Sequence, residues 1–278
     1  MVTIYSCVDV LPIPQDDNQR KLFVDCEMKV GENIEANIQY EGNSRGLSPQ
    51  YLERPDTFTF TLAEGDTDFG VPFVYDYDNK IFVIKKNQLP LKAGVKYKFR
   101  GVGINKNSTE PFIFIPTGAP IDTVFAEKIN TPTIDGKSYT MIRCTLRMKT
   151  DVENSDHLYI IAKTEDNKVG LPYFEQDFAA YKKMKHRDGF LVDQSRLKTS
   201  DLIFNIALEG AQSPKAFLLD IGNVTKSFYQ FNLFKSNSFT DPGQTAENPA
   251  IGSFNIDTEI ARGSFSAFNT SSIKILIK

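Results

Sequence analysis

The chain has 278 residues, of which 41% are hydrophobic and 24% charged, and its formal net charge at pH 7 is −3. This length and composition are typical of a soluble globular protein with two domains. The acidic balance argues against nucleic acid as a partner, and no apolar run approaches the roughly 20 residues of a membrane-spanning helix.

The N-terminal stretch TIYSC, residues 3–7, is similar to the cleavage site of a bacterial lipoprotein signal, where a cysteine follows small and hydrophobic residues. A complete signal has a charged start and about 7–15 apolar residues before that site. Only six residues precede Cys7, so the signal would have to be truncated or its start misassigned. The alternative is that Cys7 is an ordinary buried thiol.

Residues 8–20, VDVLPIPQDDNQR, contain two prolines and three acidic residues without periodicity. This composition predicts an extended tether, which would hold a lipid-anchored domain away from a membrane. The alternative is an N-terminal tail of no consequence. We expect residues 1–20 to form a lipobox remnant and tether.

Residues 21–118 consist of strand patterns separated by turns. Hydrophobic residues alternate with polar ones over 22–30 and 33–40, which is typical of strands with one buried face. The turn DYDN (76–79) between two β-rich runs predicts a hairpin. Tyr97, which follows the turn KAG on an alternating strand, is typical of the late part of an immunoglobulin-like domain. We therefore expect an immunoglobulin-like or fibronectin-like β-sandwich.

A Pro/Gly-rich linker near 116–120 separates this domain from a second β-rich domain, residues 119–278. A first helix is expected over 172–189, because aromatic residues recur there at i, i+4 and i+7 between Pro172 and Gly189.

A second helix is expected to begin after Thr225, which would cap its N-terminus. Phe228 and Phe231 would face the core, since they are three positions apart on such a helix. The second domain is thus expected to be mainly β with one or two helices.

Three cysteines leave one without a possible partner in a disulfide. Cys26 and Cys144 each share a strand face with apolar residues, so both are expected to be buried thiols. A disulfide between them is not expected, because their strands open different domains. Cys7 is the remaining cysteine.

No residue pattern indicates a catalytic or metal site. The stretch GNSRG around Ser44 matches the serine-hydrolase pattern G-x-S-x-G, but a strand and prolines follow it where that mechanism needs a helix. His157 and His186 have no metal-ligand spacing. We expect no cofactor and interpret a basic cluster as a solvated helix face: Lys182, Lys183, Lys185, His186 and Arg187.

The C-terminal third has an ordered set of features. An aspartate-containing loop precedes a strand (190–208), an aromatic helix follows (224–237), and an Asn-Pro loop leads to an Asn-Ile pair and a Gly-x-Phe (247–272). With the N-terminal Ser-Cys tether and the strand LFVDCEMKV, this order resembles the DUF4249 family of Bacteroidetes lipoproteins. The family's closing segment is usually richer in glycine, and only Gly263 and Phe265 carry over here.

The resemblance implies an immunoglobulin-like N-terminal domain and a largely β second domain. It also implies that Cys7 is the lipidated first residue of the mature chain, in the outer membrane at the cell surface or periplasmic face. Such proteins are typically encoded beside TonB-dependent transporters, so the resemblance implies a β-barrel transporter as partner. It assigns no ligand-binding residue.

The leading hypothesis is a non-enzymatic surface lipoprotein that helps a TonB-dependent transporter capture or admit an unidentified small ligand. The alternative is a fimbrial-type structural subunit, cleaved after Arg20 so that a groove accepts the next subunit's strand. A fully paired central strand over Leu22–Val30 would argue against this alternative. A ligand site is expected near the domain junction, where pockets often form.

Overall fold

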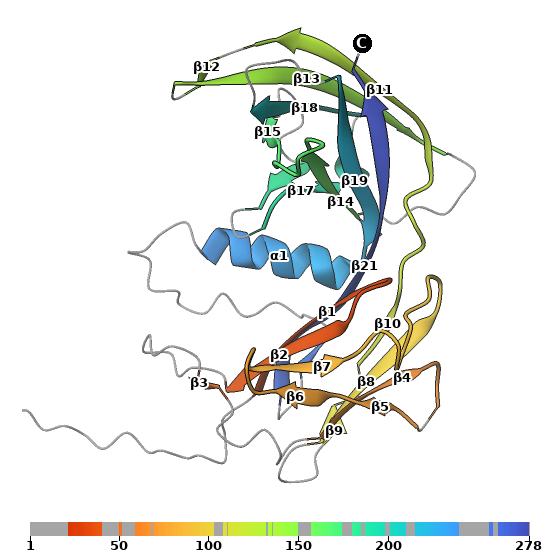
Figure 1. Ribbon diagram of the computed structural model, residues 1–278. Helices are drawn as coiled ribbons and strands as arrows, with labels where there is room; N and C mark the ends of the chain where they lie inside the picture. The colour runs from red at the N-terminus through yellow and green to blue at the C-terminus, as the bar shows by residue number, and fades with distance from the viewer. Residues whose placement is uncertain are drawn as a thin grey trace, which may run out of the picture.

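The computed structural model shows a mainly β protein, with one α-helix among the residues it describes, and so confirms the expected fold class (Figure 1). Two β-sandwiches lie one beyond the other, and one sheet runs through both. The structure describes residues 22–40, 50–51, 59–67, 69–102, 108–109, 111–131, 133–134, 136–149, 157–173, 180–184, 187–197, 201–209, 215–238, 256–257 and 261–277.

The first sandwich has two layers. One layer continues from the shared strand β21 (Ala261–Leu276) in the order β1 (Leu22–Lys29), β2 (Ile34–Tyr40), β7 (Ile81–Ile84) and β6 (Val74–Asp76). The other contains, in order, β10 (Phe112–Phe114), β8 (Lys96–Val102), β4 (Thr59–Glu64) and β5 (Val71–Pro72). Short strands β3 (Gln50–Tyr51) and β9 (Ser108–Thr109) pair with β2 and β8.

The core of the first sandwich confirms the alternation expected from the sequence. Val24, Cys26 and Met28 on β1 are fully buried, because successive side chains of a strand point to opposite faces. Aromatic rings fill the space between the layers: the ring centroids of Phe60 and Phe82 are 4.9 Å apart, in an edge-to-face arrangement.

The hairpin expected in this sandwich is also confirmed, and Tyr97 lies on strand β8. β6 and β7 pair as a hairpin around 76–79, where the Asp76 carboxylate accepts hydrogen bonds from two amides of the turn. The Tyr97 hydroxyl accepts from the Lys92 amide (3.0 Å) and donates to the Pro90 carbonyl (3.5 Å). A hydrogen bond from a tyrosine to the backbone just upstream also occurs in immunoglobulin-like sandwiches, where it is called a tyrosine corner.

The second sandwich also has two layers. One contains β16 (Tyr181–Lys183), β17 (Phe190–Asp193), β14 (His157–Lys163), β19 (Ala216–Val224) and β21. The other contains β11 (Ile121–Asn130), β13 (Lys137–Met148), β18 (Asp201–Glu209) and β15 (Leu171–Tyr173). Three short elements lie beside these strands: β12 (Thr133–Ile134), β20 (Ile256–Asp257) and the 3₁₀ turn η3 (Gln194–Arg196).

Strand β21 belongs to both sandwiches. Its first half runs parallel to β1, and its second half runs antiparallel to β19. Phe265 is fully buried in the first core, and Ile275 lies in the second core. The first sandwich therefore contains a strand from the end of the chain. The expected domain boundary at residue 118 did not include this exchange, and the boundary itself stays a prediction.

Helix α1 (Lys226–Ser238) confirms the second expected helix. The Thr225 hydroxyl accepts a hydrogen bond from the Phe228 amide at 3.3 Å, as expected for an N-cap. Phe228 and Phe231 are fully buried. The helix covers the face of the shared sheet that lies opposite the second core, and Figure 1 shows it between the two sandwiches.

The expected first helix over 172–189 is wrong. Pro172 lies in β15, an edge strand, where a residue without an amide hydrogen is tolerated. Tyr181 lies in β16 and is buried, and its hydroxyl accepts a hydrogen bond from the Ile203 amide at 3.2 Å. At these described positions, pairing with neighbouring strands therefore replaces the expected helix. Residues 174–179 and 185–186 lie outside the described part.

Two asparagines hold the linker between the sandwiches. Asn223 on β19 and Asn269 on β21 are direct partners in the antiparallel ladder. The Asn223 amide donates to the Thr117 carbonyl at 3.1 Å, and the Asn269 amide donates to the Pro116 carbonyl at 3.1 Å. The linker is therefore bound to the shared sheet by hydrogen bonds.

Cys26 and Cys144 are free and fully buried, as expected, and no disulfide joins them. Burial, reinforced by the charges of Asp25 and Glu27, raises the pKa of the Cys26 thiol. Burial raises the pKa of the Cys144 thiol to about 12. Both thiols are therefore protonated at neutral pH. Cys7 lies outside the described residues.

We predict that neither buried thiol reacts in the native protein, because the thiolate is the reactive form. In a Cys7→Ser background, Ellman's reagent at pH 8 should modify no cysteine in buffer and both remaining cysteines in urea. Rapid modification in buffer would contradict the burial of these thiols.

We predict that Gly263→Ala strongly destabilises the fold. Gly263 has a φ of +138°, and a Cβ there would lie 1.9 Å from the Val24 carbonyl oxygen on the paired strand. We expect a loss of about 3 kcal/mol or more in the free energy of unfolding, measured with urea. The control Gly31→Ala, with φ of +85° and no atom within 4 Å, should cost about 1 kcal/mol. Equal losses would contradict the close approach of β1 and β21.

Candidate functional site

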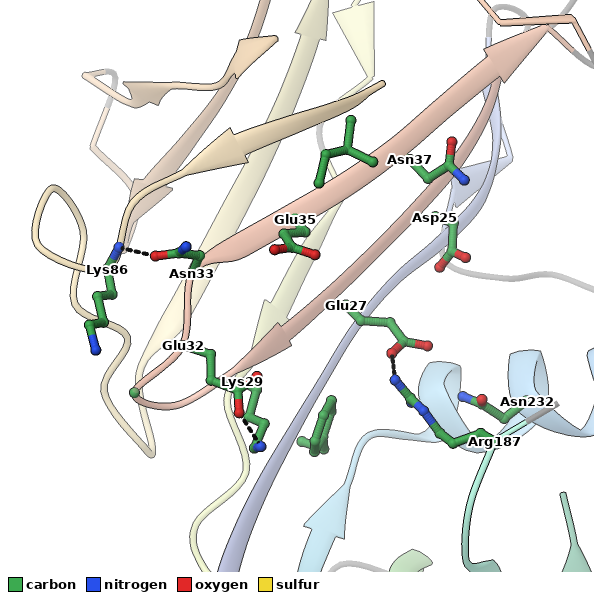
Figure 2. Close-up of a pocket in the computed structure, with 13 residues that line it drawn as sticks. Asp25, Glu27, Lys29, Glu32, Asn33, Glu35, Asn37, Lys86, Arg187 and Asn232 are labelled. Carbon is green, nitrogen blue, oxygen red and sulfur yellow. Dashed lines mark hydrogen bonds and ion pairs between the residues drawn. The ribbon is translucent and has the colours of Figure 1, made fainter. Parts of the chain in front are cut away.

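A groove lies between the outer face of the first sandwich and helix α1. Its volume is about 720 Å³. Figure 2 shows the side chains of β1 and β2 on one side, with Arg187 and Asn232 approaching from the side of α1. We call it the junction groove; its lining residues are Asp25, Glu27, Lys29, Gly31, Glu32, Asn33, Glu35, Asn37, Ile81, Lys86, Arg187, Asn232 and Phe268.

Strand alternation places the charged residues of β1 and β2 in the junction groove. Since Val24, Cys26 and Met28 point into the core, the residues between them point outward. The antiparallel register sets Asp25 opposite Asn37, and Glu27 opposite Glu35. Three carboxylates and one amide therefore share a small area of the sheet face.

Arg187 crosses the junction groove to reach the first sandwich. Its Nη2 donates to the Glu27 carboxylate at 2.6 Å, with exposed side-chain fractions of 31% for Arg187 and 19% for Glu27. The guanidinium carbon also lies 5.4–5.9 Å from the centroids of three aromatic rings, those of Tyr159, Phe228 and Phe268. This geometry combines an ion pair with cation–π contacts.

The turn that carries Arg187 is fixed by its neighbours. The Tyr159 hydroxyl donates to the Asp188 carbonyl at 2.7 Å, and burial raises the pKa of Tyr159, so this donor keeps its proton. Gly189 has a φ of +91°, and a Cβ there would lie 2.4 Å from the Ile160 carbonyl oxygen. Glycine is therefore required for the turn to approach β14.

The other charged groups of the junction groove differ in their pairing. Lys29 is paired with Glu32 at the turn between β1 and β2. The Lys86 amide donates to the Asn33 side chain at 3.1 Å. Glu35 is exposed, and its carboxylate has no hydrogen bond or ion pair within the described part of the chain.

The structure describes only some of the residues singled out from the sequence. Cys7, Ser44 and His186 fall outside the described residues. The His157 ring packs against the Tyr229 ring, with centroids 4.2 Å apart. Among the described members of the expected basic helix face, Arg187 lines the junction groove, whereas Lys182 and Lys183 lie in strand β16 instead of a helix.

The groove residues Asp25, Glu27 and Glu35 were missed because outward charges on a strand look like an ordinary solvated face. The high density of carboxylates on one face of these alternating strands could have indicated a binding site. Nothing in the sequence indicated that Arg187 would lie opposite this face. Among the described residues, no group of three or more His, Cys, Asp or Glu side chains is arranged to hold a metal ion.

Comparison with known proteins assigns no family to the chain. No protein-family model matches it, and no curated protein matches it. Within the described ranges, no helix has the length and apolar character needed to cross a lipid bilayer.

We predict that Arg187 and Glu27 are energetically coupled across the two sandwiches. A double-mutant cycle with Arg187→Met and Glu27→Gln, measured by urea unfolding, should give a coupling of about 1–2 kcal/mol, because the pair is mostly shielded from water. The control pair Lys92–Glu64, 2.9 Å apart with exposed fractions of 59% and 39%, should show a clearly smaller coupling, because solvent screens exposed ion pairs. Similar coupling energies for both pairs would show that the position of Arg187 and Glu27 at the junction does not strengthen their ion pair.

Proposed function

We propose that this protein is a non-enzymatic lipoprotein of the outer membrane that binds a ligand in the junction groove. Anchored through Cys7, it would assist a TonB-dependent transporter in ligand capture or uptake. The observation that carries the proposal is the junction groove itself, a polar cavity between two sandwiches that share one strand.

The size and construction of the junction groove support a binding role. Its volume of about 720 Å³ falls within the range of small-molecule sites, about 300–1,000 Å³. Its polar side chains project from paired strands and from a turn held by Tyr159, so they are positioned before any ligand arrives. Pre-positioned polar groups reduce the entropy lost on binding.

The pairing of β1 favours this role over the fimbrial alternative. β1 pairs with β2 on one side and with β21 on the other, as a central strand of the shared sheet. A strand that follows cleavage at Arg20 and accepts a neighbour's strand would need an open edge beside it. Both edges of β1 are occupied by strands of its own chain.

We predict that the protein, affinity-tagged and purified from its own outer membrane in mild detergent, brings a β-barrel transporter with it in a fixed ratio. The Cys7→Ala variant should be absent from the membrane fraction, because it would lack the lipid anchor. An unchanged membrane distribution of Cys7→Ala would refute the anchor. Recovery of ladders of the protein itself without a transporter would favour the fimbrial alternative.

A further inference from the structure

We propose that the junction groove binds a short peptide through a basic side chain, whose ammonium or guanidinium group contacts Glu35 and the neighbouring Asp25. This inference rests on the proposed function, in which the groove is a ligand site. It adds the chemical class of the ligand and the residues that select it.

The negative charge of the sheet face formed by β1 and β2 favours a basic ligand group. Glu27 and Glu35 are direct cross-strand partners, and like charges in that position repel each other. Arg187 compensates Glu27 from the side of α1, but Glu35 has no such partner in the described residues. A cationic group of a ligand would form an ion pair with Glu35, as Arg187 does with Glu27.

The fold already contains one guanidinium group bound in this groove. Arg187 reaches the sheet face from another part of the chain and is held by Glu27. Its flat group also lies against aromatic rings, among them Phe268, which lines the groove. The same surface can therefore hold a basic group of a ligand in the way that it holds Arg187.

Sugars and anionic ligands fit the junction groove less well. A sugar would need a free aromatic face for stacking, whereas the Arg187 guanidinium lies over Tyr159, Phe228 and Phe268, and Lys29 lies 5.8 Å from the Phe268 centroid. An anionic ligand would meet the carboxylates of β1 and β2.

A peptide carries both signs of charge, and the junction groove offers both. Lys86 lies at the opposite end of the groove from Asp25 in Figure 2. Its ammonium group has no ion-pair partner in the described part of the chain and suits a peptide carboxylate. A basic side chain between Glu35 and Asp25 and a carboxylate at Lys86 would both be held in the junction groove.

The test is isothermal titration calorimetry of the full-length protein with the tripeptides Lys-Lys-Lys, Ala-Ala-Ala and Glu-Glu-Glu, and with maltotriose, at low ionic strength. We expect Lys-Lys-Lys to bind most tightly. Glu35→Gln and Asp25→Asn should each raise its Kd about threefold to fivefold, the effect of one partly exposed ion pair. Circular dichroism would confirm that each variant is folded.

The matched control is Glu209→Gln, which removes one negative charge from an exposed position on β18, away from the junction groove. Its Kd for Lys-Lys-Lys should be unchanged. An equal loss in Glu209→Gln would show attraction to overall negative charge and overturn the proposal.

Preferred binding of Glu-Glu-Glu or maltotriose, or no binding of Lys-Lys-Lys, would also overturn the proposed ligand class. These outcomes are distinguishable from failure of the proposed function. If Lys-Lys-Lys binding depends on Glu35 but no transporter is recovered from the membrane, the ligand class stands and the transporter role fails.

Discussion

The pairing of β21 with two partners is the constraint on which the rest of the structure depends. Its first half completes the first sandwich beside β1, and its second half completes the second sandwich beside β19. The approach to β1 is so close that residue 263 has no room for a side chain. Because one continuous strand belongs to both cores, the relative position of the two sandwiches is set by backbone hydrogen bonds.

The junction groove is a consequence of that pairing. β1 is held beside β21, so its charged outer face is turned toward the region where α1 and the Arg187 turn lie. The ion pair between Arg187 and Glu27 then connects residues 160 positions apart in the chain. The aromatic residues beneath Arg187 belong to the small core under α1, so the groove and the packing of the helix are physically linked.

Features that depend on residues close to one another in the sequence were predictable. Alternation identified the inward faces of β1 and β13, and Thr225 with its following phenylalanines identified α1. The helix over 172–189 failed for the reverse reason. Short apolar segments are compatible with a helix or a strand, and pairing of β15 with β18 and of β16 with β17 decided between them. The Arg187 position could not be predicted, because its partners lie on strands and on helix α1 far from it in the sequence.

The sequence by itself determined which faces of the strands are apolar, where hairpins turn, where one helix begins and that two cysteines are buried. These properties follow from local periodicity and side-chain chemistry. Only the tertiary structure decided that the last strand serves both sandwiches and that Glu27, Glu35 and Arg187 line one groove. Strand pairing between residues far apart depends on how the whole sheet closes, which local patterns do not specify.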